Sequence, residues 1–311
     1  MKKTKNKSKD IKNDIEFAVC NSFPKTDLAL ETHEFNVEKG EDDGIITENY
    51  QISGYEITKT IVGEEKGEKQ SGKRAGQYIT VDVGELQLKS SSQLETLAIA
   101  LSVLIKEQIP QGDGCILVAG IGNDEIVSDA IGPKTISGVI ASRHIKKLKN
   151  GLYTSMNLGD VVAVQTGVMG TTGLESAEFV SALVEKLSPK CVIAVDSLAS
   201  RRLSRLATTV QISNAGISPG AGVANRRLEL NENTLGVPVI AIGIPTVVDA
   251  FTLVSDFVGG EHFADLQCKK NNFFVAPKES DKIIKEASKL LSMSINIALH
   301  GLSPSEIVEL Q

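Results

Sequence analysis

The 311-residue sequence contains no tryptophan, only four histidines and only four cysteines, and aromatic residues make up 4% of the chain. The cysteines, which are Cys20, Cys115, Cys191 and Cys268, lie far apart and form no C-x-x-C pair. A disulfide framework or a structural zinc site is therefore not expected, and the chain is typical of a reducing compartment. The longest apolar runs, of which Val237–Ile244 is one, are far too short to cross a membrane.

Positive charge is scarce relative to negative charge. The chain has 33 Lys and Arg residues against 39 Asp and Glu residues, a net charge of −6, which argues against direct binding to nucleic acid. Lysines crowd the start of the chain, but no apolar run follows them, so this segment is no secretory signal. With 41% hydrophobic and 23% charged residues, the composition is that of a globular protein. We expect a cytoplasmic protein that binds neither membranes nor nucleic acid directly.

The N-terminal part, residues 27–90, shows the alternation typical of β-strands. In Tyr55–Val62 and Tyr78–Val83, polar and apolar residues alternate and many are β-branched. Between them, the polar stretch Gly63–Gly76 favours a loop. We therefore predict a small β-rich part before the rest of the chain.

From residue 91 to residue 311 the pattern changes to apolar strands that alternate with amphipathic helices. Ser92 and Glu95 form a capping-box signature for a helix over 94–109. Apolar runs predict strands at 115–119, 160–165, 191–195 and 237–242. Further helices are predicted from Pro133, over 175–187, over about 246–257 and over 280–299. This order predicts an α/β fold whose mostly parallel sheet is flanked by helices.

Two aspartates follow strands of this predicted sheet, at the edge where ligands of open α/β sheets bind. Asp129 ends the loop after the first strand, and Asp196 follows the apolar run of the third. If these strands are neighbours, both carboxyls face one crevice, where they cannot both ionise and share a proton. One can then act as general base on water while the other polarises a carbonyl or protonates a leaving group. Alternatively, each aspartate simply caps a helix or a turn.

Glycine-rich segments beside these aspartates are candidate substrate contacts. Gly122 and Asn123 follow the first strand, and Gly170, Thr171 and Thr172 follow the second. Backbone N–H groups of such loops can bind the carbonyl oxygen of a scissile bond. The two threonines either donate to a substrate carbonyl or merely lead into the next helix.

Other motifs and candidate residues give weaker functional signals. The sequence has no Walker A motif, no H-E-x-x-H and no G-x-S-x-G, and its G-I-G run at 120–122 lacks the third glycine of a dinucleotide fingerprint. His144 is more typical of a packed or surface residue than of a metal ligand. The loop Gly216–Gly222 with Arg226 and Arg227 is either an anion cradle or an ordinary connection with two solvated arginines. No cofactor and no metal site is predicted.

Several longer motifs resemble the germination protease, or spore protease, of endospore-forming bacteria, an atypical aspartic peptidase family. They are GIGNDEIVSDAIGPK at 120–134, GVMGTTGLE at 167–175, VIAVDSLASR at 192–201, the stretch 211–227 and VPVIAIGIPTVVDA at 237–250. Near the start, the run K-T-D-L-A at 25–29 is similar to the family's R-T-D-L-A. The resemblance is dense over 114–254 and thin over 35–110 and after 258.

The resemblance implies an endopeptidase that degrades small acid-soluble spore proteins during germination, in the forespore or spore core. It also implies a homotetramer and a zymogen that removes its own N-terminal segment. The family's two essential aspartates fall on Asp129 and Asp196, which the sheet-edge argument also selects. Its processing site falls between Thr26 and Asp27, so residues 1–26 would be a propeptide and 91–311 the catalytic domain. A raised carboxyl pKa in the aspartate pair would make the activity depend on pH in a bell-shaped way.

The chain departs from the family pattern at a few positions. Lys25 stands where the family usually has Arg, Ser218 stands where many members have His, and Asn214 and Ala224 replace an expected Asp and Gly. The motif Gly-x-Gly-Asn…Asp and the fold are also similar to hydrogenase maturation peptidases, which are much shorter and are thought to recognise a metal bound to their substrate. The remaining alternatives are a phosphorylase-like protein that binds an anion at the loop 216–222, and an inactive homologue that binds spore proteins without cutting them.

Overall fold

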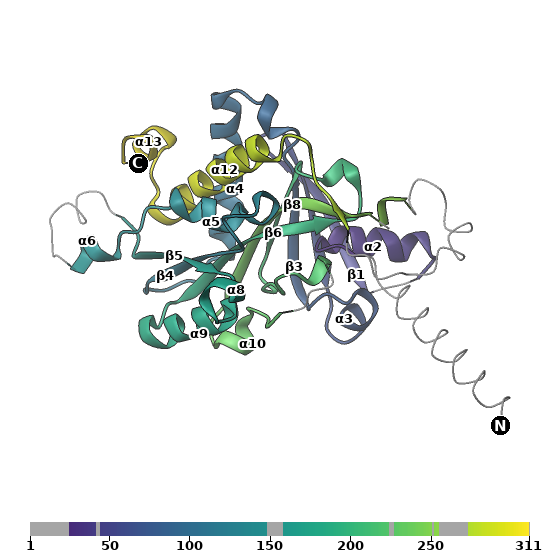
Figure 1. Ribbon diagram of the computed structural model, residues 1–311, viewed down its shortest axis with the longest axis horizontal. Coiled ribbons are helices and arrows are strands. Elements are labelled where there is room, and N and C mark those ends of the chain that lie inside the picture. Colours follow the sequence, from purple (N-terminus) through teal and green to yellow (C-terminus); the bar gives the residue numbers. More distant parts are fainter. Residues whose placement is uncertain are drawn as a thin grey trace.

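The computed structural model describes residues 25–41, 44–147, 158–223, 227–250, 252–254 and 273–310. Within these residues, nine strands form one sheet in the order β1-β2-β3-β7-β8-β6-β4-β5, with β9 paired to β8 (Figure 1). The strands are β1 (Ile45–Ile52), β2 (Tyr55–Val62), β3 (Gly76–Asp82), β4 (Ile116–Ile121), β5 (Val161–Gly167), β6 (Cys191–Ser200), β7 (Thr209–Ser213), β8 (Val239–Asp249) and β9 (Phe274–Val275).

This sheet combines a parallel and an antiparallel half. Strands β5, β4, β6 and β8 are parallel neighbours, as the alternation of apolar runs and helices predicted. Strands β1, β2, β3 and β7 continue the sheet through antiparallel pairs, and β7 joins β8 in the same sense. The α/β class is confirmed, while the parallel order is limited to four strands. The strands of the predicted β-rich N-terminal part are the antiparallel end of the same sheet.

Helices cover both faces of the parallel half (Figure 1). The described α-helices are α2 (Ala29–Glu38), α3 (Lys66–Ser71), α4 (Ser91–Gln108), α5 (Ile131–Ser137), α6 (Arg143–Lys147), α8 (Met169–Thr172), α9 (Ser176–Leu187), α10 (Glu232–Leu235), α12 (Ser280–His300) and α13 (Pro304–Leu310). Short 3-10 turns are η1 (Leu86–Leu88), η2 (Val127–Asp129), η3 (Leu203–Arg205) and η4 (Ala221–Val223). Helices α4, α5 and α12 lie on one face, and α9 and α10 lie on the other.

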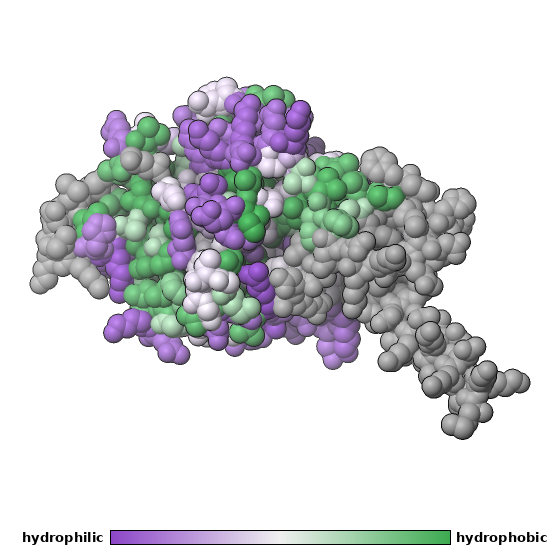
Figure 2. Space-filling model, viewed as in Figure 1, coloured by the Kyte–Doolittle hydropathy of each residue, from purple (hydrophilic) through white to green (hydrophobic). Residues whose placement is uncertain are grey.

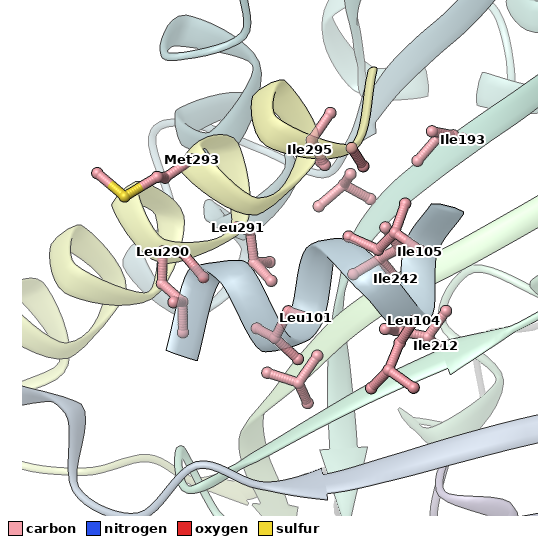
Figure 3. Packing of buried hydrophobic residues seen from close by; sticks show 14 of the residues in the cluster. Leu101, Leu104, Ile105, Ile193, Ile212, Ile242, Leu290, Leu291, Met293 and Ile295 are labelled. Atoms are coloured by element: carbon pink, nitrogen blue, oxygen red, sulfur yellow. The ribbon is translucent and has the colours of Figure 1, made fainter. Parts of the chain in front are cut away.

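Apolar side chains from these helices bury both faces of the parallel strands. On one face, Leu101 of α4 and Leu291 of α12 belong to the same cluster as Ile193 of β6 (Figure 3). On the other face, Val180 of α9 belongs to a second cluster. Because β4 is covered on both sides, all of Ile116–Ile121 is buried. Each fully buried aliphatic side chain contributes about 1.5–3 kcal/mol, so these strands are a rigid base for the loops at their carboxyl ends.

Two predictions for the N-terminal part are wrong in detail. The stretch 63–76, predicted as a loop, contains α3, and the alternating pattern did not predict α2. The buried side chains of α2 include the polar Glu31, Thr32 and Asn36. A helix whose buried face is largely polar shows no apolar stripe, which is why its sequence resembled a loop or a strand.

Two further predictions fail at element boundaries. A helix was expected from about residue 246, but β8 continues to Asp249 because β6 pairs with it as far as Val248. Part of the expected helix over 246–257 lies outside the described residues. The capping box of α4 is formed by Ser90 and Gln93 instead of Ser92 and Glu95, so this helix begins three residues before the predicted start.

Among the described helices, none is both long enough and apolar enough to cross a membrane. Cys115 and Cys191 are buried free thiols, as expected for small core residues. Cys20, Cys268 and most of the expected propeptide lie outside the described residues.

Candidate active site

Asp196 lies on β6 at the level where its neighbour β4 ends. The last described pair between these strands joins Gly120 to Val195, so Asp196 is the first residue of β6 beyond β4. On the other edge, β6 stays paired with β8 as far as Ser200, with Gly243 beside Asp196. The strand therefore continues past Asp196 instead of ending there, as the sequence suggested. Regular pairing fixes one edge of β6, and the other edge is free for the loop that follows β4.

That loop is shaped around Asp129. Gly122 has a φ of 120°, and a Cβ atom at this position would collide with the carbonyl oxygen of Asp129. The N–H of Asn123 donates to Asp129 Oδ2 at 2.9 Å and to the Asp129 carbonyl oxygen at 3.1 Å. Helix α5 has no side-chain cap at its start. The alternative that Asp129 merely caps this helix is therefore wrong, because the turn 122–123 holds its carboxylate.

Two hydroxyl groups tie this loop to the neighbouring strands. Thr246 of β8 donates through Oγ1 to the Ser128 carbonyl oxygen at 2.6 Å. The N–H of Ile131 donates to Ser197 Oγ at 3.4 Å. Sequence reasoning did not select Thr246 or Ser197 for these roles, although both lie in the motifs that resemble the family. Hydroxyls within otherwise apolar strands were the available signal.

The two aspartates interact electrostatically. Asp196 is 4% exposed, and burial together with the nearby charge of Asp129 raises its pKa well above the ordinary value of 3.8. Burial also raises the pKa of Asp129, while the Asn123 N–H and the positive charge of Arg227 oppose that shift. Within the described part of the chain, the one hydrogen bond to the Asp196 carboxylate is donated by the Ser197 N–H at 2.8 Å. The predicted aspartates thus lie close enough for the charge of Asp129 to act on the pKa of Asp196.

The segment at the predicted processing site lies farther along the same strand. Asp27 is partly buried and accepts from the N–H of Ala199 at 2.8 Å and from the N–H of Gly222 at 2.9 Å. Its own N–H donates to the Ala199 carbonyl oxygen at 2.8 Å. Burial raises the pKa of Asp27, opposed by the charge of Lys73 and by both N–H donors. The charge of Asp27 in turn contributes to the raised pKa of Asp196, so the two sites lie near each other.

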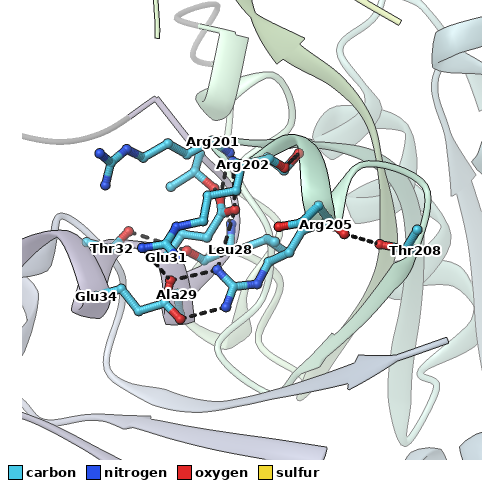
Figure 4. A network of polar contacts seen from close by, with 12 residues as sticks. Leu28, Ala29, Glu31, Thr32, Glu34, Arg201, Arg202, Arg205 and Thr208 are labelled. Atoms are coloured by element: carbon cyan, nitrogen blue, oxygen red, sulfur yellow. Dashed lines mark hydrogen bonds and ion pairs between the residues drawn. The ribbon is translucent and has the colours of Figure 1, made fainter. Parts of the chain in front are cut away.

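Glu31 of α2 anchors this segment to the end of β6. Its buried carboxylate accepts from the N–H groups of Arg201 at 2.6 Å and Arg202 at 3.0 Å, and from Thr26 Oγ1 at 2.5 Å. The guanidinium of Arg205 lies 3.6 Å from it. Figure 4 shows this network between the acidic side of α2 and the arginines that follow β6.

The loop Gly216–Gly222 binds an anion, but the anion is part of this chain. Its Gly222 N–H is directed at the Asp27 carboxylate. A cavity of about 100 Å³ beside it is lined by Asp27, Lys73, Ser218 and Gly243, among others. Arg226 and Ala224 lie outside the described residues. The geometry therefore gives the phosphorylase-like alternative no support of its own.

The remaining predicted contacts lie at the same edge of the sheet. Gly170, Thr171 and Thr172 form α8, directly after β5, and are exposed. Both threonine hydroxyls donate to the Val168 carbonyl oxygen, at 2.9 Å and 3.1 Å. Asn214, a departure from the family pattern, accepts from the Gln77 N–H at 2.8 Å. In the described part of the chain, His, Cys, Asp and Glu side chains form no group of three that could hold a metal ion.

The sequence is similar to known proteins along most of its length. A family model described as germination protease matches residues 25–264. A germination protease from Caldanaerobacter subterraneus subsp. tengcongensis is 38% identical over 321 residues, which cover 92% of this chain and 97% of that protein. One from Clostridium perfringens is 36% identical over 319 residues, with the same coverage. Among solved structures, a nickel–iron hydrogenase maturation protease from Thermococcus kodakarensis KOD1 has a TM-score of 0.35 and 17% identity, and the match covers 62% of this chain and 98% of that one.

Proposed function

Because the chain belongs to the germination protease family and is a peptidase, we propose that it is an endopeptidase that degrades small acid-soluble spore proteins during germination. The observation that carries the mechanism is the meeting of Asp129 and Asp196 at the edge shared by β4 and β6. Each of these carboxyls has a raised pKa, and that of Asp196 is raised partly by the charge of Asp129.

The environments of the two carboxyls suggest different roles. Asp129 is the more exposed and receives the Asn123 N–H, which stabilises its ionised form. It is the general base that takes a proton from water as the water attacks the carbonyl carbon of the peptide bond. Asp196 is more buried and keeps its proton to a higher pH, so it donates to the carbonyl oxygen. As the C–N bond breaks, Asp129 gives its proton to the leaving amine and Asp196 takes back a proton from a hydroxyl of the tetrahedral intermediate, so both carboxyls are regenerated without a covalent enzyme intermediate.

The same pair would process the chain itself. We place the cut between Thr26 and Asp27, which makes residues 1–26 a propeptide. Support comes from the position of Asp27, which is bound to Ala199 on the strand that carries Asp196. The charge of Asp27 also acts on the pKa of Asp196, which supports a cut beside this residue.

Protein substrates would cross the exposed loops around the pair. Gly122, Asn123 and α8 are the proposed contacts, although the Asn123 N–H is already directed at Asp129. Ile126, Met169 and Leu174 in these loops are 52%, 54% and 46% exposed, and Figure 2 shows apolar surface over the region of β5. Exposed apolar side chains beside a site favour a protein partner. We further propose a homotetramer that acts in the cytoplasm of the forespore and spore core.

Cleavage of a purified acid-soluble spore protein tests this function. The full chain is compared with its Asp129→Asn, Asp196→Asn and Asp160→Asn versions, and products are identified by mass spectrometry. Asp160 is the matched control, because it pairs with Arg143 at the opposite end of β5. We expect cutting, and a new N-terminus at Asp27, in the parent and the control only. Equal cutting by all four versions would show that the carboxyl pair is not catalytic.

A further inference from the structure

The pairing of β8 with β6 skips one residue, Thr246. Leu198 of β6 lies beside Pro245 of β8, and the next residue, Ala199, lies beside Val247. Thr246 is therefore the extra residue of a β-bulge in a parallel pair of strands, where bulges are rare. A bulge changes the direction of the side chain that it carries, and bulges are common next to active sites.

A strained residue lies beside this bulge. Ala207 has a φ of 61°, a left-handed conformation that residues with a side chain rarely adopt. Its N–H donates to the carbonyl oxygen of Pro245, the residue just before Thr246, at 2.8 Å. Strain of this kind persists only where the surrounding structure imposes it, and it gathers at functional sites. Two unusual backbone features thus meet at one threonine.

The Thr246 side chain is directed at the peptide group between Ser128 and Asp129. It is buried, and its Oγ1 donates to the Ser128 carbonyl oxygen at 2.6 Å. The N–H of the same peptide group, which belongs to Asp129, donates to the Ile126 carbonyl oxygen at 2.8 Å. Hydrogen bonds therefore fix both sides of the peptide group that leads into Asp129.

Thr246 links Asp129 to the sheet. In the described part of the chain, the hydrogen bonds of Asp129 itself end within its own loop, at Asn123 and Ile126. These bonds shape the loop, but they do not set its distance from β6, the strand that carries Asp196. The hydroxyl of Thr246 comes from β8, which pairs with β6 on both sides of the bulge. It therefore fixes the loop relative to Asp196.

A second hydrogen bond between this loop and the sheet is weaker. The Ile131 N–H donates to Ser197 Oγ over 3.4 Å, which is longer than the usual range of about 2.7–3.2 Å. The bond from Thr246 is short and buried by comparison. Of the two hydroxyls, Thr246 thus contributes more to the position of the loop.

We propose that Thr246 is a positioning residue for the general base, Asp129. Through the Ser128–Asp129 peptide group, it holds the Asp129 carboxylate where this group and Asp196 can act on one peptide bond. The inference rests on the proposed function, since it assumes that Asp129 is catalytic. It deepens that function by giving a role in catalysis to a residue outside the carboxyl pair.

Three variants of the full chain test this proposal. Thr246→Val keeps the shape of the side chain and removes the hydroxyl, while Thr246→Ser keeps the hydroxyl and removes the methyl group. Thr135→Val is the matched control. Thr135 is buried on α5, the helix that follows the Asp129 loop, and its Oγ1 has no hydrogen-bond partner among the described residues. With a spore-protein substrate, kcat and KM are measured separately and normalised to the folded fraction from circular dichroism.

We expect Thr246→Val to lower kcat about a hundredfold, the cost of a displacement of about 1 Å in a catalytic group, with little change in KM. Thr246→Ser and Thr135→Val should keep a kcat close to that of the parent. If Thr246→Val lowers only the folded fraction and leaves kcat per folded molecule unchanged, the threonine is merely structural and the proposal is overturned. If Thr246→Ser loses as much kcat as Thr246→Val, the hydroxyl is not the group that matters, which also overturns it.

Asp129→Asn separates a failure of this inference from a failure of the proposed function. If Asp129→Asn is inactive and Thr246→Val keeps the kcat of the parent, the inference alone is wrong. If Asp129→Asn cuts the substrate as fast as the parent, or the parent does not cut it, the proposed function fails and the inference fails with it.

Discussion

Two buried carboxylates lie against strand β6, and their surroundings differ in almost every respect. Glu31 reaches the end of the strand from α2 and meets two backbone N–H groups, a hydroxyl and a guanidinium. Asp196 belongs to the strand itself, receives the Ser197 N–H and faces a second carboxyl, Asp129. Both side chains are almost completely buried, at 1% and 4% exposure. Burial alone therefore does not distinguish an anchoring carboxylate from a reactive one.

The difference lies in how the buried charge is compensated. A carboxylate with several donors and a cation, such as Glu31, fixes the elements that it joins. A carboxylate with one donor and a like-charged neighbour has a raised pKa, as Asp196 does. The comparison teaches that two carboxylates of similar depth in this molecule differ in the number of donors and in the charges around them.

The largest expected effect concerns activity. Asp196→Asn should reduce the rate of substrate cleavage by about a thousandfold, because general acid catalysis contributes on this scale. Glu31→Gln should keep most of the rate per folded molecule. Glu31 contacts only the anchoring network, which consists of Thr26 and the arginines 201, 202 and 205 that follow β6. Initial rates with a spore-protein substrate, normalised to the folded fraction, measure both. A loss of activity of similar size in both variants would contradict the proposed difference between Asp196 and Glu31.

The second effect concerns stability. Here a Glu31 variant, and not the Asp196 variant, should show the loss. Glu31→Ala should lower the free energy of unfolding by about 3 kcal/mol, because removal of one member of a buried ion pair leaves its donors without a partner. Urea denaturation followed by circular dichroism measures this change. A loss below about 1 kcal/mol, the value typical of exposed pairs, would show that the network is dispensable.

The third effect is a gain in stability. The pKa of Asp196 is higher in the folded chain than the ordinary 3.8, so the protonated form stabilises the fold and ionisation weakens it as pH rises through the raised pKa. Asp196→Asn, which never ionises, should therefore be more stable than the parent at pH 7, by about 1.4 kcal/mol for each unit of the shift.

Melting temperatures of parent and variant across a range of pH test this sign. The gain should shrink as the pH falls and disappear below about 3.8, where the parent's carboxyl is protonated in both the folded and the unfolded chain. A variant that is less stable than the parent at pH 7 would mean that the Asp196 carboxylate is compensated as well as Glu31 is.

The smallest effect tests the outer edge of the anchoring network. Glu38 contacts Arg202 at 2.6 Å and Arg201 at 3.4 Å, but its side chain is 50% exposed. Glu38→Ala should change the free energy of unfolding by only about 0.5 kcal/mol, because solvent screens exposed ion pairs. The same urea titration, at low and high salt, measures it. A change in the free energy of unfolding as large as that of Glu31→Ala would mean that the exposed ion pairs of Glu38 stabilise α2 as much as the buried contacts of Glu31 do.

The aspartate pair could be predicted from the sequence because the signals that locate it are strong. Strand β4 and the first five residues of β6, Cys191–Val195, are continuous apolar runs, and Asp196 follows the second run directly. Parallel strands of an α/β sheet place their carboxyl ends at one edge, which brings Asp129 and Asp196 together. The structure adds the reason for Gly122, whose positive φ lets the turn close on Asp129.

The anchor and β8 could not be predicted in the same way. Helix α2 is held by ion pairs to Arg201, Arg202 and Arg205, so hydrophobic periodicity carries no signal for it. The run from Pro245 to Asp249 resembled a helix start because proline favours the first turn of a helix. Pairing with β6 keeps it extended instead, which is a tertiary effect that no local pattern reveals.

The place of β8 between β7 and β6 also sets an order of events during synthesis. The ribosome makes Asp129 and Asp196 well before it makes Thr246, whose hydroxyl ties the Asp129 loop, and Asp249, which holds Lys25. Until β8 has emerged, β6 lacks its neighbour on that edge, and the antiparallel half cannot join the parallel half through β7. The last strand to enter the middle of the sheet thus supplies Thr246 and Asp249, so a chain that ends before β8 lacks the contacts that these residues make with the Asp129 loop and with Lys25.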